Sequence, residues 1–119
     1  MPFSPRCLED IRAECAAFAD ERDWQQFHTP KNLSMALAIE AAELMEHFQW
    51  LTAAESAALP PERREAVALE LADVLLYLVR LADRLDVDLL AAATRKIVLN
   101  AEKYPVERAR GTSRKYNEI

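Results

Sequence analysis

The chain has 119 residues, of which 51% are apolar, and carries a formal net charge of −5 at pH 7. A chain of this length can bury a real core without disulfides, so we expect a single domain over residues 1–119. The acidic balance argues against a polynucleotide partner, which favours a basic surface. Gly111 is the single glycine, so the sequence has no glycine-rich loop for binding phosphate.

The expected compartment follows from the absence of targeting signals. No stretch approaches the roughly 20 apolar residues of a membrane span, and the N-terminus lacks a signal-peptide pattern. We therefore expect a cytoplasmic protein with no membrane partner. Cys7 and Cys15 would lie about 12 Å apart on one helix, which is too far for a disulfide.

The first predicted helix follows an N-terminal arm over residues 1–5. Apolar residues recur with helical spacing from Leu8 to Phe18, and this pattern ends near Glu21 or Arg22. The next segment, residues 22–28, is rich in aromatic rings and amides. It could cap a core, or it could supply stacking faces and hydrogen bonds for a planar base.

The second predicted helix begins at the Thr-Pro pair of residues 29–30, which supplies an N-cap hydroxyl and a proline at the first helical position. We expect this helix to run to about Trp50. The segment Thr52-Ala-Ala-Glu55 is a capping box, which predicts one short helical turn over residues 53–59.

A third helix is expected from about residue 61 to Leu85, and Asp88 is the predicted N-cap of a fourth over residues 89–103. We expect residues 106–119 to form an extended tail. The short connection between the second and third helices favours antiparallel packing. The predicted fold class is therefore an all-α four-helix bundle.

Two pairs of acids interrupt the apolar faces of the second and third helices. Glu40 and Glu43 are three residues apart, as are Glu70 and Asp73, so each pair lies on one helix face. A buried carboxylate costs several kcal/mol or more unless it is paired or binds a metal. Four carboxylates facing each other across two helices suit a hard cation. We predict that this cation is Mg²⁺.

Two other interpretations of the acids are open. A single Glu-x-x-Glu is usually a solvated helix face in a chain with 20 acidic residues. A carboxylate-bridged iron bundle needs Glu-x-x-His on two helices. Glu43 is followed three residues later by Glu46, and His47 is one place out of register, so the iron site is disfavoured.

Aromatic residues keep helical spacing with the acids. Trp50 lies seven residues after Glu43, and Tyr77 lies seven after Glu70. These rings form either part of an aromatic core or the walls of a base pocket. Lys96 and Asn100 share a face of the last helix, which is either solvated or a clamp for phosphate.

The order Glu-x-x-Glu, about two dozen residues, then Glu-x-x-Asp resembles the all-α nucleoside triphosphate pyrophosphohydrolases of the MazG-like family. Within that family, residues 21–33, residues 43–50 and residues 70–79 are similar to the dCTP pyrophosphatases. The likeness continues through Ser113-Arg-Lys-Tyr116 and so covers nearly the whole chain.

The resemblance implies hydrolysis of dCTP or a related deoxynucleoside triphosphate to the monophosphate and pyrophosphate, which would serve nucleotide-pool sanitation. It also implies assembly as a homotetramer. By that likeness Mg²⁺ is held by Glu40, Glu43, Glu70 and Asp73. The implied substrate contacts are Trp24, Gln25, Gln26, Phe27, His28, Trp50 and Tyr77, with Lys96 and Asn100 reaching phosphate or completing the pocket.

Three points remain open in this interpretation. Glu43 is our candidate for the base that takes a proton from the attacking water. Cys15 departs from the pattern of the animal enzymes, which carry a substrate-contacting histidine there, so a different or broader base selectivity is possible. The rival hypothesis is a non-catalytic helical oligomerisation module whose acids bind metal structurally.

Overall fold

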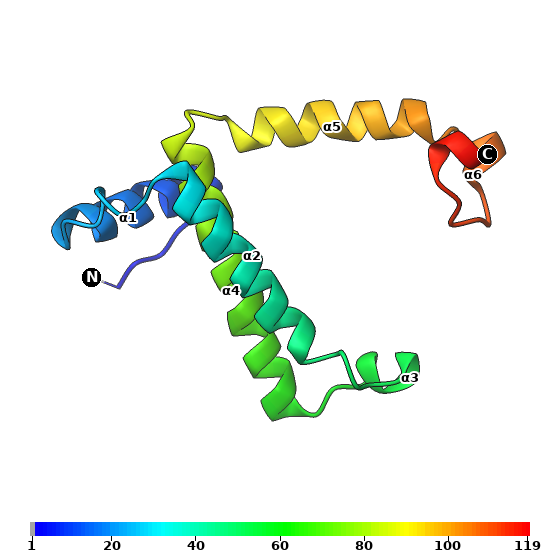
Figure 1. Cartoon of the computed structure of the whole chain (residues 1–119), viewed down its shortest axis with the longest axis horizontal. Coiled ribbons are helices and arrows are strands. Elements are labelled where there is room, and N and C mark those ends of the chain that lie inside the picture. Colours follow the sequence, from blue (N-terminus) through cyan, green and yellow to red (C-terminus); the bar gives the residue numbers. More distant parts are fainter. Residues whose placement is uncertain (1) are drawn as a thin grey trace. The chain divides into compact units, whose positions relative to one another are not determined.

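The computed structural model describes residues 2–119, so Met1, the first residue of the expected arm, lies outside the described residues. Within residues 2–119 every regular element is helical, which confirms the predicted all-α class (Figure 1). The chain divides into two compact units, one ending at Asp86 and the other spanning Val87–Ile119. The single domain expected over residues 1–119 stays a prediction.

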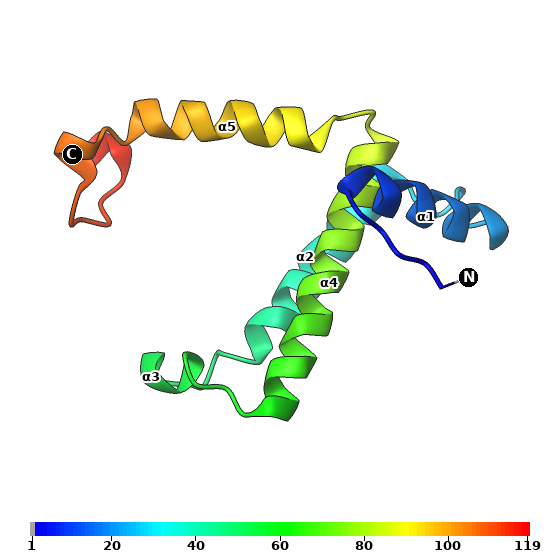
Figure 2. The same ribbon diagram turned by 180° about the vertical axis from the view of Figure 1, so that it is seen from behind.

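The first helix, α1 (Leu8–Glu21), has the bounds that the apolar spacing predicted. It packs against α4 (Pro61–Arg84), and Figure 2 shows it beside the C-terminal part of that helix. An ion pair between Arg12 and Asp83, 3.2 Å from Nη1 to Oδ1, joins the two helices. The thiols of Cys7 and Cys15 are free, as expected.

The second helix, α2 (Pro30–Glu46), begins as predicted, because the Thr29 hydroxyl accepts a hydrogen bond from the backbone N–H of Asn32. Its expected end near Trp50 was wrong. After Glu46 the backbone N–H groups of residues 47 and 48 donate to carbonyls three residues back. Bonds of this type tighten the chain into turns and end the α-helix.

Helices α2 and α4 form the antiparallel pair that the short connection predicted (Figures 1 and 2). The connection contains α3 (Ala53–Ser56), whose capping box is present as predicted, although the helical turn is shorter than the expected 53–59. The buried residues of the first unit come from its helices and are mainly Ala19, Leu33, Val67, Val79 and Ala82. This pairing sets the acid-bearing faces of α2 and α4 toward each other.

The second unit begins with α5 (Leu89–Lys103), and the Asp88 side chain caps it by accepting from the N–H of Ala91. The expectation of an extended tail was wrong. Residues 106–119 contain α6 (Val106–Ala109) and a 3₁₀ turn, η1 (Tyr116–Glu118). The Tyr116 ring lies edge-on to Tyr104, with centroids 6.2 Å apart, and this contact folds the tail back on the end of α5. Among the described helices, none combines the length and apolarity needed to cross a membrane.

Candidate functional site

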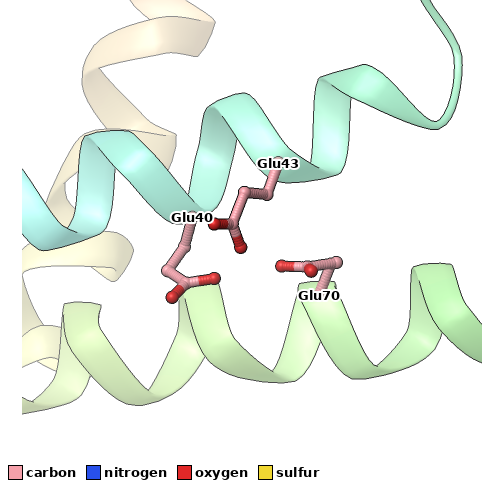
Figure 3. A group of neighbouring side chains, drawn as sticks. All are labelled: Glu40, Glu43 and Glu70. Atoms are coloured by element: carbon pink, nitrogen blue, oxygen red, sulfur yellow. The ribbon is translucent and has the colours of Figure 1, made fainter.

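Three of the four predicted acids converge between α2 and α4. Glu40 and Glu43 come from α2 and Glu70 from α4, and Figure 3 shows their carboxylates pointing toward a common space. One oxygen from each lies within 4.8 Å of the others. The three-residue spacing places the first two on one face, and the antiparallel pairing brings the third opposite them.

The carboxylates are placed where their charges repel and where water reaches them poorly. Oε2 of Glu40 and Oε2 of Glu70 are buried, and within residues 2–119 neither has a hydrogen-bond partner. Burial raises the pKa of Glu40 to about 7, and the negative charges of Glu43 and Asp73 raise it further. Partnerless carboxylate oxygens aimed at one space are the donor set of a hard divalent cation. The residues therefore fit a metal site.

Asp73, the fourth predicted ligand, is not one of the three clustered carboxylates. It lies three residues after Glu70 on α4, and its negative charge contributes to the raised pKa of Glu40. Its side chain also lines a cavity next to the cluster. Asp73 therefore connects the clustered acids with that cavity.

The cavity has a volume of about 460 Å³ and lies within the first unit. This is within the usual size range of small-molecule sites. Its walls are mainly apolar, and the Phe18 and Trp24 rings meet edge-on with centroids 5.7 Å apart. Of the residues singled out in the sequence, the cavity gathers Cys15, Trp24, His28, Asp73 and Tyr77.

Arg80 lines the same cavity but was missed by the sequence analysis. It is 4% exposed, and its Nε donates to Nδ1 of His28 at 3.0 Å. A signal was available in the spacing, because Asp73, Tyr77 and Arg80 follow one another at intervals of four and three. An arginine that continues the face of Asp73 and Tyr77 is almost never fully buried unless it is paired, so it indicates a specific partner.

Several predicted substrate contacts do not line the cavity. Gln25 accepts hydrogen bonds from arginine side chains of α4, and Gln26 donates to the carbonyl of Asp23 in its own loop. Phe27 is exposed. Trp50 is 87% exposed and lies beyond the end of α2, so the spacing that placed it on the acid face does not apply. The substrate roles of these residues stay predictions.

Lys96 and Asn100 lie on α5 in the second unit. They are four residues apart on one α-helix, so they share a face of it, as their spacing predicted, and both are exposed. Their expected contact with phosphate or with the pocket stays a prediction.

Comparison with known proteins places this geometry in a family. The profile of the MazG-like family matches residues 35–119. The chain is 51% identical to dCTP pyrophosphatase 1 of Homo sapiens and 50% identical to that of Mus musculus, in each case over 98% of this chain and 71% of the relative. A solved pyrophosphatase from Archaeoglobus fulgidus is also similar, with a TM-score of 0.79 and 37% identity over 88% of this chain and 98% of that one. On these matches, which cover most of the sequence and the fold, the chain belongs to the MazG-like family.

Proposed function

We propose that this protein is a Mg²⁺-dependent pyrophosphohydrolase that converts dCTP, or a related deoxynucleoside triphosphate, to the monophosphate and pyrophosphate. Its family membership and its relatives make it a nucleoside triphosphate diphosphatase-like hydrolase. The dCTP substrate is proposed from the similarity to the curated dCTP pyrophosphatases. A role in nucleotide-pool sanitation belongs to the same proposal.

The observation that carries this proposal is the carboxylate cluster beside the cavity. Glu40, Glu43 and Glu70 present oxygens within 4.8 Å of one another, and two of those residues have a buried oxygen without a partner in residues 2–119. The adjoining cavity has aromatic walls and room for a nucleobase. A metal-bound triphosphate with its base in the cavity would use both features.

The four acids would hold the metal, and one of them would also accept a proton. We assign the metal to Glu40, Glu43 and Glu70, with Asp73 as the fourth ligand. When bound, Mg²⁺ would offset phosphate charge and lower the pKa of a coordinated water. Glu43 would accept the proton of the water that attacks the α-phosphorus.

The cavity residues would bind the nucleoside. Trp24 and Tyr77 offer ring faces for stacking, and His28 offers a hydrogen-bonding group. Cys15 lies in the same wall and can influence which bases fit. Gln25, Gln26, Phe27, Trp50, Lys96 and Asn100 are assigned to substrate by resemblance alone.

We also propose that the protein is a homotetramer. Large apolar side chains are exposed on the acid-bearing pair, including Ile39 at 58%, Leu69 at 61% and Leu71 at 53%, and on α5, including Leu90 and Ile97. Exposed apolar surface of this kind favours association with further copies. Sedimentation analysis measures the mass directly, and a monomer at micromolar concentration would contradict the proposal.

The test of the activity is direct. The protein is incubated with the four common deoxynucleoside triphosphates, 5-methyl-dCTP and the ribonucleotide CTP, each with and without Mg²⁺. Monophosphate and pyrophosphate are then separated by ion-exchange chromatography. We expect Mg²⁺-dependent release from dCTP or a close analogue. No release from any nucleotide would favour the non-catalytic oligomerisation module.

A further inference from the structure

Arg80, the buried arginine of the cavity wall, donates hydrogen bonds to three side chains. The Arg80 guanidinium donates to Nδ1 of His28 from Nε at 3.0 Å, to Oδ2 of Asp83 from Nη1 at 3.2 Å, and to Oε1 of Gln25 from Nη2. Asp83 forms an ion pair with Arg80 and so offsets part of the guanidinium charge. Arg80 and His28 both line the 460 Å³ cavity. The guanidinium is thus fixed at several points, and one of them is the imidazole ring.

The chemistry of this contact determines where the hydrogen of the imidazole sits. A guanidinium has five N–H donors and no acceptor. The His28 Nδ1 that it contacts must therefore be an unprotonated acceptor. A neutral ring with Nδ1 unprotonated carries its hydrogen on Nε2. The ring can then act only as a donor toward a further partner.

Other groups around His28 favour the neutral ring. Burial lowers the pKa of His28, and the charges of Arg80 and Arg84 lower it further. Arg84 also donates from Nε to the backbone carbonyl of His28 at 3.0 Å. The backbone and the ring of this residue are therefore held by two different arginines.

We propose that Arg80 is a positioning residue for substrate selection: it holds His28 in the Nε2–H form, so that the cavity presents a hydrogen-bond donor to the nucleobase. A base edge with an acceptor, such as the O2 atom of a pyrimidine or the N3 atom of cytosine, is favoured at this point. The selection of a base rests on the proposed function. The form of the histidine does not.

The form of the histidine is tested without any nucleotide. Long-range ¹H–¹⁵N spectra of the full-length protein distinguish the protonated from the unprotonated ring nitrogen. The chain has two histidines, so a His47→Gln variant assigns the signals. We expect an unprotonated Nδ1 and a protonated Nε2 for His28 in the wild type. A protonated Nδ1, or a mixture of both forms, would overturn the proposal. This measurement is made on the wild type, so it does not depend on whether an Arg80 variant folds.

The variant arm compares Arg80→Met with Arg84→Met. Methionine keeps much of the length of the side chain and removes every donor. In Arg80→Met we expect the His28 signals to move toward a mixture of the two forms. Arg84 donates to the backbone carbonyl of His28 and not to Nδ1, so at a pH well above the His28 pKa Arg84→Met should leave the ring in the Nε2–H form. Unchanged His28 signals in a folded Arg80→Met would contradict the positioning role.

The kinetic arm tests the consequence for substrate. If the Nε2–H form falls to roughly a third to a half of the population in Arg80→Met, KM for dCTP should rise roughly twofold to threefold while kcat changes little. Arg80→Met should lose less activity toward a 2-deoxyribose triphosphate without a base than toward dCTP, because the abasic substrate has no base edge for His28. A fall in kcat with unchanged KM would overturn the selection role. If the wild type hydrolyses no nucleotide, the proposed function fails, and the spectra still decide the form of His28.

Discussion

Replacing Glu40 with glutamine tests whether ionisation of this buried carboxyl group destabilises the folded protein. Burial and the neighbouring acids raise the pKa of Glu40 from 4.5 to about 7. The folded, metal-free protein therefore keeps a proton that the unfolded chain releases. The contribution of Glu40 to the unfolding free energy is therefore largest below about pH 4.5 and is lost as the pH rises from there through about 7. Glutamine imitates the protonated form at every pH, so the variant should not show this loss.

The size of the effect follows from the pKa difference. One pKa unit corresponds to about 1.4 kcal/mol, so the rise to about 7 represents on the order of 3 kcal/mol. Between pH 4 and pH 8 without metal, Glu40→Gln should gain about this much in unfolding free energy relative to the wild type. Mg²⁺ at 100 times its dissociation constant should raise the unfolding free energy of the wild type by about 2.7 kcal/mol at pH 8, and that of the variant by much less.

The assay is urea unfolding followed by tryptophan fluorescence, at one fixed protein concentration, in EDTA and in Mg²⁺. Subtracting the unfolding free energy of the wild type from that of the variant at each pH cancels the contributions of groups that titrate alike in both proteins. Glu46→Gln is the matched control, because Glu46 is an exposed acid at the end of the same helix and lies outside the cluster. A difference between Glu40→Gln and the wild type that does not change with pH in EDTA would refute the reasoning. So would equal stabilisation of both proteins by Mg²⁺.

Three further predictions concern single side chains. Glu43→Gln and Asp73→Asn should each abolish pyrophosphate release while circular dichroism shows an intact helical fold, because both carboxylates are only partly buried. Trp50→Ala should raise KM far more than it lowers kcat, and should change the melting temperature little because the ring is 87% exposed. Leu33→Ala should lower the unfolding free energy by about 2–5 kcal/mol in urea titrations, because Leu33 is 1% exposed.

Each of these has a result that contradicts it. Pyrophosphate release at the wild-type rate from either acid variant would remove that acid from the chemistry. An unchanged KM in Trp50→Ala would make this tryptophan a surface residue with no part in substrate binding. A loss below about 1 kcal/mol in Leu33→Ala would mean that the leucine lies outside the cooperative core. Leu85→Ala, at an exposed position, is the matched control.

Local sequence signals predicted most of the helix bounds. The Thr29 cap, the capping box at residues 52–55 and the Asp88 cap are all present, because each depends on a side chain bonding to backbone within three residues. The end of α2 was wrong by four residues. No proline or glycine marks it in the sequence, and the chain leaves the helix through three-residue hydrogen bonds after Glu46. The error moved Trp50 off the face on which it had been placed.

The spacing of Glu40, Glu43 and Glu70 was enough to predict that they face one another, since residues three apart share a helix face and a short connection makes neighbouring helices antiparallel. Which oxygens are buried, and how far the pKa of Glu40 rises, depends on the packing of α2 against α4 and cannot be read from spacing. The same holds for Arg80. Its sequence position shows only that a charged residue continues the face of Asp73 and Tyr77. Its contact with His28, 52 residues earlier in the chain, exists because the fold brings the loop before α2 against α4. Local rules decide what each helix offers, and tertiary packing decides which groups lose water and meet each other.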